Sequence, residues 1–248
     1  MPFMELVCAT KNKGKAAEIA ALLAGEYNIL TLDQLGIDED INEDGMTFEE
    51  NAIKKAVGFM KLTGKIVLAD DSGLEVNALN GAPGVYSARF LGRDTPYSVK
   101  NRKLLEMLEG AENRSARFRC VIVVAFPNGH MLRRCAEKNF THDAAVWQKD
   151  KEDVKFISKH CLTVAGILEG EIAHEPTGTD GFGYDPVFYV PEYRMTLAQM
   201  NAEQKNKISH RGKAMAEMRK LLTQCFSCGG SNATLLPRKN NDLYFLAK

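Results

Sequence analysis

The sequence has no excess of charge of one sign, because Lys and Arg number 32 and Asp and Glu also number 32. Proteins that bind a nucleic-acid backbone neutralise its phosphates and usually carry a basic excess. The sequence also has no stripe of interleaved aromatic and basic residues, which disfavours a structural RNA-binding protein. We therefore expect no nucleic-acid partner, and a small phosphorylated ligand held by a local basic cluster fits better.

Long apolar runs are also missing. No run of about 18 apolar residues exists, so no membrane-spanning helix and no membrane partner are expected. Residues 1–11 lack a basic stretch followed by a long apolar one, so we expect no secretory signal and a cytoplasmic location. Of the six cysteines, only Cys225 and Cys228 have C-x-x-C spacing. A zinc site needs a second pair of ligands, so reduced thiols are favoured.

What is present is typical of an ordinary globular chain. The 248 residues are 45% hydrophobic and 26% charged, which excludes a disordered, collagen-like or coiled-coil protein. An apolar strand over 3–9, a polar turn with glycine and a helix over 15–24 open the chain, as in an α/β protein. Later strands, the strongest over 118–126, predict a mixed architecture with several antiparallel pairs.

Several local signals predict where the later elements begin. Thr47 and Glu50 form a possible capping box for a helix over 47–61. Thr95-Pro96 predicts the start of a helix through residue 108. A hairpin turn is expected at 127–129. The last helix should begin at Ser209, with its inner face formed by Met215, Met218 and Leu222.

The first candidate site is the polar turn Thr10-x-Asn12-x-x-Lys15 between the first strand and helix. Free backbone N–H groups at a helix N-terminus bind anions, and Lys15 adds a positive charge. The turn lacks the spacing and the following hydroxyl of the G-x-x-x-x-G-K-[ST] phosphate loop. Two interpretations stay open: a phosphate site, or a solvated turn whose side chain caps the helix.

Acidic residues form the second candidate, comprising Glu43, Asp44, Glu49, Glu50, Asp70 and Asp71. A hard divalent cation needs carboxylates together with water and substrate phosphates. Asp70-Asp71 follow an apolar run over 66–69, and Ser72-Gly73 predicts a tight turn that keeps the carboxylates exposed at a strand end. The alternative is a turn-capping Asp70 and a merely solvated Asp71. We expect Glu49 to be an exposed helix residue.

Two later segments combine aromatic, acidic and basic groups. In Gly181-Phe-Gly-Tyr-Asp-Pro186, aromatic residues flank a glycine, which suits a rigid loop that stacks on a planar ring. A glycine turn that buries both aromatics is the other interpretation. In Lys205-x-x-x-Ser209-His-Arg-Gly-Lys213, basic residues at a helix start oppose the helix dipole, which points to an anionic or carbonyl-bearing partner. Lys207 and Lys213 are equally consistent with a plain surface.

Six ordered motifs together span most of residues 3–222. They are Thr10-x-Asn-x-x-Lys15-x-x-Glu18, Thr47-Phe-x-Glu-Asn-Ala52, Ala69-Asp-Asp-Ser-Gly-Leu74, Gly81-Ala-Pro-Gly-Val-Tyr-Ser-Ala-Arg89, Gly181-Phe-Gly-Tyr-Asp-Pro186 and Ser209-His-Arg-Gly212. With them the sequence resembles the inosine/xanthosine triphosphate pyrophosphatase (ITPase-like) family, closest to its bacterial-type members. The resemblance implies a single α/β domain over 1–248. Its fold would be elongated and two-lobed, with a mixed twisted sheet flanked by helices and an active-site cleft between the lobes.

The resemblance also implies a homodimer, a required Mg²⁺, and hydrolysis of ITP, dITP and XTP to the monophosphate and pyrophosphate. By position, Asp71 would accept a proton, Lys15 would act in catalysis, and the metal ligands would be Glu43, Asp70 and Asp71. The triphosphate would be held by Thr10, Lys11, Asn12, Lys13, Gly14 and Lys15, with Ser72 and Lys205 assisting. The base pocket would be formed by Phe182, Gly183, Tyr184, Asp185, His210 and Arg211.

Two segments depart from the family pattern. Residues 137–160 are predicted to be a patternless surface insertion, and residues 226–248 an extra C-terminal tail. Neither interrupts a motif. One alternative function is a Mg²⁺-dependent pyrophosphatase for other modified nucleotides, since the motifs determine the phosphate chemistry more firmly than the base. The other is a catalytically silent nucleotide-binding protein, which would need a broken acidic set, whereas all the acidic residues above are present.

Overall fold

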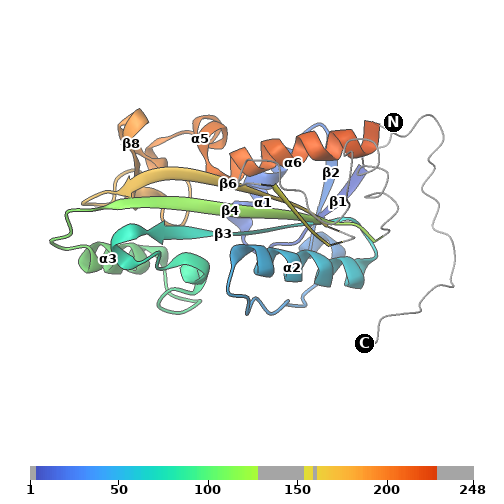
Figure 1. Cartoon of the computed structure of the whole chain (residues 1–248), viewed down its shortest axis with the longest axis horizontal. Helices are drawn as coiled ribbons and strands as arrows, with labels where there is room; N and C mark the ends of the chain where they lie inside the picture. Colours follow the sequence, from blue (N-terminus) through green and yellow to red (C-terminus); the bar gives the residue numbers. More distant parts are fainter. Residues whose placement is uncertain (1–3, 128–153, 159–160, 228–248) are drawn as a thin grey trace, which may run out of the picture.

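The computed structural model describes residues 4–127, 154–158 and 161–227. This part of the chain is elongated and built on an eight-stranded mixed sheet with the order β2-β1-β3-β4-β6-β7-β8, to which β5 is added beside β6. Helix α6 lies along one face of the sheet and helix α2 lies on the other (Figure 1). The predicted elongated α/β fold with a mixed sheet is therefore confirmed.

Three long antiparallel strands form the middle of the sheet: β3 (Val67–Val76), β4 (Ser115–Ala125) and β6 (Cys161–Ile172). Their length holds the two ends of the molecule together. They are rich in β-branched and apolar residues, which favour a buried pleated surface. In β4, every residue from Cys120 to Ala125 is buried.

Shorter strands extend the sheet at both edges. On one side, β1 (Met4–Cys8) pairs in parallel with β3 and with β2 (Tyr27–Thr31). On the other side, β5 (Val154–Ser158) and β7 (Phe188–Val190) pair with opposite ends of β6, and β8 (Met195–Thr196) pairs with β7. The first edge is parallel because α1 crosses over between β1 and β2.

The helices are α1 (Lys13–Leu22), α2 (Phe48–Thr63), α3 (Tyr97–Met107), α5 (Ala202–Ile208) and α6 (His210–Ser227). The predicted starts of α1, α2, α3 and α6 are confirmed to within a few residues. Thr47 caps α2 by accepting a hydrogen bond from the Glu50 N–H, and Ser209 caps α6 by accepting one from Gly212. The Glu50 side chain binds the Met46 N–H, so the second half of the expected capping box is missing.

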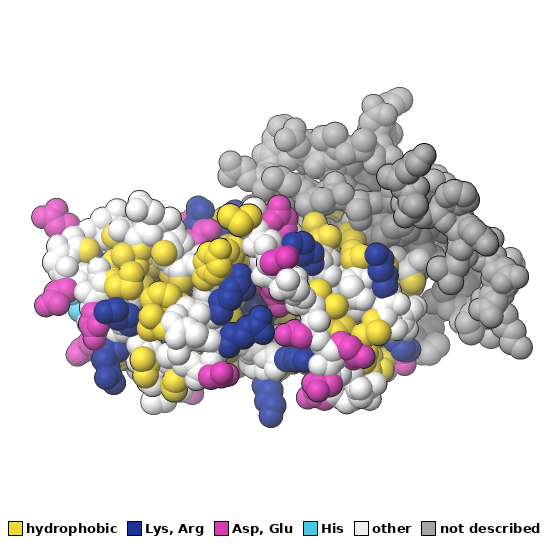
Figure 2. Space-filling view, turned by 90° about the horizontal axis from the view of Figure 1, so that it is seen from below, with side chains coloured by type: hydrophobic (Ala, Val, Ile, Leu, Met, Phe, Trp, Pro, Cys, Tyr) yellow, Lys and Arg dark blue, Asp and Glu magenta, His cyan; other side chains and the backbone are white. Residues whose placement is uncertain are grey.

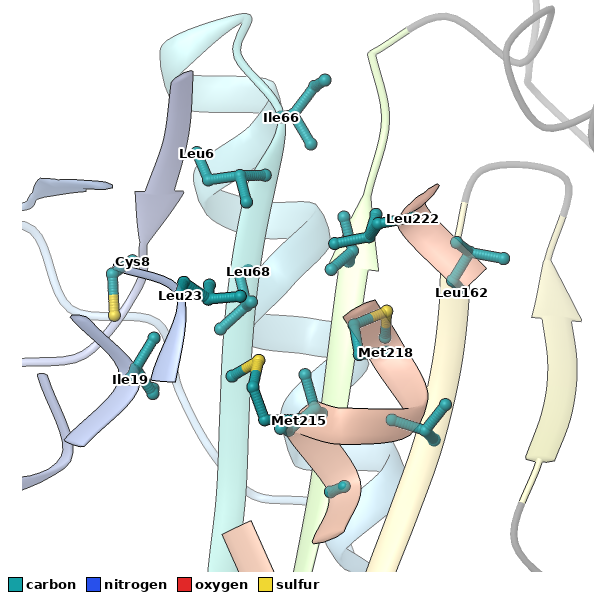
Figure 3. Packing of buried hydrophobic residues seen from close by; sticks show 14 of the residues in the cluster. Leu6, Cys8, Ile19, Leu23, Ile66, Leu68, Leu162, Met215, Met218 and Leu222 are labelled. Atoms are coloured by element: carbon teal, nitrogen blue, oxygen red, sulfur yellow. The ribbon is translucent and has the colours of Figure 1, made fainter. Parts of the chain in front are cut away.

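Buried hydrophobic residues form three clusters around the long strands. On one face, Met215, Met218 and Leu222 of α6 pack onto the sheet as predicted (Figure 3). On the other face, α2 contributes Phe48 and Phe59 to a second cluster. These two clusters form the first lobe. A third cluster, from α3, β7 and the far ends of the long strands, forms the second lobe.

The predicted turn at 70–73 is wrong, because β3 continues without interruption through Asp70, Asp71, Ser72 and Gly73. Both aspartates are buried, with 1% and 7% of their surface exposed. Acidic residues, serine and glycine favour turns locally, but here each residue pairs across to β4. Gly73 is needed for a different reason: a Cβ there would lie 2.4 Å from the Gly84 carbonyl oxygen.

The two segments that depart from the family pattern are described only in part. Residues 154–158 of the predicted insertion form β5, so the expectation of a patternless segment is wrong there. That stretch pairs antiparallel with β6, the next strand along the chain. Helix α6 reaches into the predicted tail as far as Ser227. The remainder of both segments, and the hairpin expected at 127–129, lie outside the described residues beyond 127. In the part of the chain that is described, no helix is long and apolar enough to cross a membrane.

Candidate active site

Strand β3 presents Asp70 and Asp71 to opposite faces of the sheet, because successive side chains of a strand alternate. Asp70 faces α1 and α6, where it contacts Lys15 and Arg211. Asp71 lies opposite Val121, which belongs to the cluster on the α2 face. The two adjacent carboxylates therefore have different surroundings and are suited to different tasks.

Asp70 is the centre of a buried ion network. Its Oδ1 lies 2.9 Å from Lys15 Nζ, and its Oδ2 accepts hydrogen bonds from Arg211 Nη2 at 3.2 Å and Nε at 3.3 Å. The Cys120 thiol donates to the same oxygen. Burial opposes ionisation of Asp70, but the charges of Lys15 and Arg211 outweigh it and hold the pKa of Asp70 well below its usual range. Asp70 is therefore a fixed negative charge.

The network continues toward the aromatic loop. Glu18 of α1 pairs with Arg211 Nη1 and lies 2.7 Å from Lys205 Nζ. Lys205 Nζ also lies 2.6 Å from Asp185 Oδ2, which accepts a hydrogen bond from the Phe182 N–H at 2.7 Å. The predicted residues from three distant motifs are thus brought together by alternating charges.

Asp71 has only part of its hydrogen-bonding capacity used. Its Oδ1 accepts the Ser72 N–H at 3.1 Å, whereas its buried Oδ2 has no hydrogen-bond partner among the described residues. Burial, aided by the negative charges of Glu43 and Asp70, raises the pKa of Asp71 to about 6 against the opposing charges of Lys15 and Lys55. A buried carboxylate oxygen without a partner is a position where a cation or a proton is stabilised.

Glu43 stands on the same side as Asp71, in the predicted acidic loop between β2 and α2. Lys55 of α2 holds it, with Nζ 2.9 Å from Glu43 Oε2 and 3.1 Å from the Asp70 carbonyl oxygen. No group of three His, Cys, Asp or Glu side chains in the described ranges is arranged to hold a metal. A Mg²⁺ here would take Glu43 and Asp71 as protein ligands and complete its shell with phosphate oxygens and water.

The side chains present fit a Mg²⁺ ion, because the unpartnered Asp71 Oδ2 and the Glu43 carboxylate are hard oxygen ligands. Asp70, also predicted as a ligand, is already paired with two buried cations. Its role as a metal ligand stays a prediction. The geometry suits it better to orienting Lys15 and Arg211.

At the phosphate turn, both earlier interpretations describe part of what is seen. Asn12 caps α1, since its Oδ1 accepts the Lys15 N–H at 3.1 Å, and Thr10 Oγ1 accepts the Asn12 N–H at 3.2 Å. Lys11 Nζ donates to the Asp38 carbonyl and Lys13 is exposed. No acidic residue occupies the first turn of α1, so its N-terminus keeps its positive potential.

A hollow of about 50 Å³ between the lobes collects the remaining predicted residues. Its lining includes Asn12, Lys15, Ser72, Phe182, Gly183, Tyr184, Asp185, Lys205, His210 and Arg211. The Phe182 ring lies 4.6 Å from Lys205 Nζ and packs where a Cβ on Gly14 would come within 2.7 Å of it.

The two aromatic residues of the loop have different surroundings. Tyr184 is buried, with its hydroxyl donating to the Ser87 carbonyl at 2.9 Å, whereas Phe182 is half-buried. Only Phe182 therefore remains available to stack on a ligand.

Three comparisons with known proteins agree on the family. The family model described as the Ham1 family matches residues 6–221. The chain belongs to the Ham1 family. This confirms the resemblance inferred from the motifs. The dITP/XTP pyrophosphatase of Desulforamulus reducens is 45% identical, over 90% of this chain and 98% of that protein. That of Bacillus subtilis is 40% identical, over 88% and 96%.

Solved structures of Ham1 proteins are also similar. The Ham1 protein from Coxiella burnetii is 39% identical, covers 89% of this chain and 99% of that one, and has a TM-score of 0.69. The Staphylococcus aureus Ham1 protein is 38% identical over 88% and 97%, with a TM-score of 0.68. The similarity therefore covers nearly the whole Ham1 chain.

Several residues around this site were not predicted from the sequence. Lys55 and Asn101 are buried polar side chains on α2 and α3, and Asn101 donates to the Gly183 carbonyl at 3.1 Å. A polar residue on the apolar face of an amphipathic helix was the available signal. Glu49, expected to be exposed, instead pairs with Arg119 at 2.5 Å.

The pair of Glu49 and Arg119 lines a second hollow of about 490 Å³ on the α2 face. Figure 2 shows Lys and Arg side chains gathered near the middle of that face. This hollow is larger than the one between the lobes, but the motif residues that line it are those at the start of α2 and Val85. The phosphate, base and Asp-Asp motifs instead meet at the smaller hollow.

Proposed function

We infer that this Ham1-family protein is a nucleoside-triphosphate pyrophosphatase. It hydrolyses deaminated purine nucleoside triphosphates, namely ITP, dITP and XTP, to the monophosphate and pyrophosphate and so cleanses the nucleotide pool. The names of relatives at 40–45% identity support this substrate class. The observation that carries it is the buried Asp71 Oδ2, which has no hydrogen-bond partner among the described residues and lies on the same side as Glu43. The next residue, Ser72, lines the hollow between the lobes together with Asn12 and Lys15 of the phosphate turn.

Mg²⁺ is the proposed cofactor, held by Glu43 and Asp71. When bound, it supplies positive charge that neutralises phosphate oxygens and the pyrophosphate leaving group. Asp71 accepts the proton of the water that attacks the α-phosphorus. Without the metal, burial raises the pKa of Asp71 to about 6, so its carboxylate is already ionised at neutral pH and able to accept a proton.

Lys15 and the N-terminus of α1 stabilise the charge that accumulates on the leaving side. Lys15 is kept in place by Asp70, whose negative charge raises the pKa of Lys15 even though burial alone would lower it. The ammonium group is therefore permanently charged and stays near the strand that carries Asp71. Ser72 and Lys205 assist in holding the triphosphate.

Base selection relies on donors that face the hollow between the lobes. A 6-oxo purine accepts a hydrogen bond from Arg211 or His210, whereas the amino group of adenine sets donor against donor. Burial and the Arg211 charge hold the pKa of His210 well below its usual range, so His210 is neutral and donates from one nitrogen. Guanine keeps the 6-oxo group, so its exclusion requires a crowded or unpaired environment at C2.

The test is pyrophosphate release from ITP, XTP, GTP and ATP with Mg²⁺, for the native chain, Asp71→Asn and the control Asp40→Asn. Asp40 is an exposed residue paired with Arg93 on the surface. We expect pyrophosphate from ITP and XTP in the native chain and the control, and none from Asp71→Asn. Orthophosphate as the product would mean that a different bond is cleaved.

Three other results bear on the base assignment and on the alternatives. GTP turnover equal to that of ITP would overturn the base assignment. Turnover confined to modified pyrimidine or methylated nucleotides would replace the substrate class. Nucleotide binding that persists with EDTA and without any turnover would indicate the silent binding protein.

A homodimer in the cytoplasm completes the proposal. Met46 and Tyr86 are large apolar side chains with 76% and 52% of their surface exposed, and a partner subunit would cover them. Light scattering after size exclusion should give twice the chain mass of 27.5 kDa for the native protein. The chain mass itself for Met46→Glu would support this surface, and a monomeric native protein would contradict it.

A further inference from the structure

The motif Thr47-Phe-x-Glu-Asn-Ala52 has no part in the chemistry above, yet it contacts the loop that carries Glu43. Asn51 is fully buried on α2, and its Oδ1 accepts the Gly45 N–H at 2.7 Å. The preceding residue, Glu50, accepts the next backbone N–H of the loop, that of Met46, at 2.7 Å. The N–H groups of Gly45 and Met46, just after Glu43, are therefore both hydrogen-bonded to side chains of α2.

Lys55 completes the attachment from the same face of the helix. It lies one turn after Asn51, since residues four apart are neighbours on a helix, and its Nζ is 2.9 Å from Glu43 Oε2. The loop is bound at its backbone by Asn51 and at its side chain by Lys55. Without the hydrogen bond from the Gly45 N–H to Asn51, the loop that carries Glu43 would be free to move. Repulsion between the carboxylates of Glu43 and Asp71 would then drive Glu43 away from Asp71.

The fit at Gly45 shows how closely the loop lies against the helix. A Cβ at Gly45 would stand 2.7 Å from Asn51 Oδ1 and 2.8 Å from Glu50 Cβ. The Asn51 Nδ2, by contrast, has no hydrogen-bond partner among the residues described. The acceptor oxygen of Asn51 is therefore the part of the amide that the structure uses.

We propose that Asn51 is a positioning residue that holds Glu43 at the distance from Asp71 at which both carboxylates bind one divalent cation. This inference rests on the proposed function, from which the cation comes. Outer-shell partners of metal ligands typically change metal affinity by about 10–100-fold when they are removed, because they fix the ligand before the ion arrives. Asn51 acts through Glu43 and touches neither the cation nor the substrate.

The experiment measures Mn²⁺ binding directly, without nucleotide, from the loss of the free-ion signal in electron paramagnetic resonance. Asn51→Ala should weaken Mn²⁺ binding about tenfold. Gly45→Ala should have a similar effect, because the added Cβ would clash with Asn51 Oδ1 and break the same hydrogen bond from the loop side. Asn51→Asp keeps an acceptor oxygen for the Gly45 N–H, although it adds a buried carboxyl group. Its Mn²⁺ affinity should therefore fall less than that of Asn51→Ala.

Lys54→Ala is the matched control. Lys54 contacts the same loop, at Asp44 Oδ1, but both side chains are largely exposed, at 44% and 62%. Its Mn²⁺ affinity should equal that of the native chain. The Mg²⁺ concentration for half-maximal ITP hydrolysis should rise about tenfold in Asn51→Ala, with kcat at saturating Mg²⁺ and the KM for ITP unchanged.

Each result separates this inference from the proposed function. Native Mn²⁺ affinity in Asn51→Ala and Gly45→Ala, or an equal loss in Lys54→Ala, would overturn the role of Asn51. If Asn51→Ala does not fold, Gly45→Ala decides. A native chain whose Mn²⁺ affinity depends on Asn51, but which releases no pyrophosphate from any nucleotide, would overturn the proposed function and leave the positioning role in place.

Discussion

The carboxylate of Asp70 and the guanidinium of Arg211 meet inside the protein, with Asp70 Oδ2 3.2 Å from Arg211 Nη2. They are 141 residues apart in the chain and join β3 to the first turn of α6. Both side chains are almost completely excluded from solvent, and Lys15 supplies a second cation to the same carboxylate. This contact fixes the phosphate turn and the start of α6 relative to the strand that carries Asp71.

Asp70→Asn should be strongly destabilising. The substitution leaves Lys15 and Arg211 buried with less compensating charge, and loss of one partner of a buried ion pair costs about 3–5 kcal/mol. Urea unfolding checks this against Asp40→Ala, which breaks an exposed pair with Arg93 and should change stability by less than about 1 kcal/mol. Equal effects of the two variants would show that the buried network is not structural.

His210 should make stability depend on pH. Burial and Arg211 lower the pKa of His210 below its ordinary 6.5, so the unfolded chain binds a proton that the folded chain does not. Stability therefore falls as pH drops below that unfolded value, by at most about 1.4 kcal/mol per unit from this group. Asp71, whose pKa is raised, changes stability with pH in the opposite direction. The contribution of His210 must therefore be separated from that of Asp71.

The difference between the native chain and His210→Gln isolates this group. Urea unfolding between pH 5 and 8 should show the native chain losing stability relative to His210→Gln on the acid side. Parallel curves for the two proteins would mean that His210 binds a proton equally well in the folded and the unfolded chain.

Gly166 should tolerate no side chain. A Cβ there would lie 2.2 Å from the His210 carbonyl oxygen and 2.6 Å from the Ala214 N, both backbone atoms of α6. Gly166→Ala should therefore cost about 1–3 kcal/mol and displace the start of α6. In Gly58→Ala the atoms nearest to the Cβ belong to the side chain of Ile41 and not to backbone, so its effect should stay within about 1 kcal/mol. Thermal unfolding of both variants distinguishes them.

Asn101 should contribute to substrate binding through the aromatic loop. Its Nδ2 donates to the Gly183 carbonyl, between Phe182 and Tyr184. Asn101→Ala removes one hydrogen bond worth about 1 kcal/mol, so the KM for ITP should rise about fivefold with little change in kcat. Arg102→Ala, an exposed neighbour on α3, is the control. A fall in kcat with an unchanged KM would assign Asn101 a different role.

Local signals predicted the helices well, because caps act over a few residues. Thr47 and Ser209 each accept an N–H from three residues later, as the sequence indicated. The apolar spacing of Met215, Met218 and Leu222 likewise identified the inner face of α6. The same local reasoning failed at Asp70-Asp71, where residues typical of turns lie in the middle of a strand.

The sequence by itself determined the motifs, the helix starts and the family, because these depend on residue identity and short spacing. Only the tertiary structure decided that Asp70 and Asp71 face opposite sides of one strand and that Lys15 and Arg211 share Asp70. It alone joined Asn51 to the Glu43 loop. The physical reason is that buried charges and unpaired polar atoms are stabilised or penalised by partners far away in the chain, which no local pattern contains.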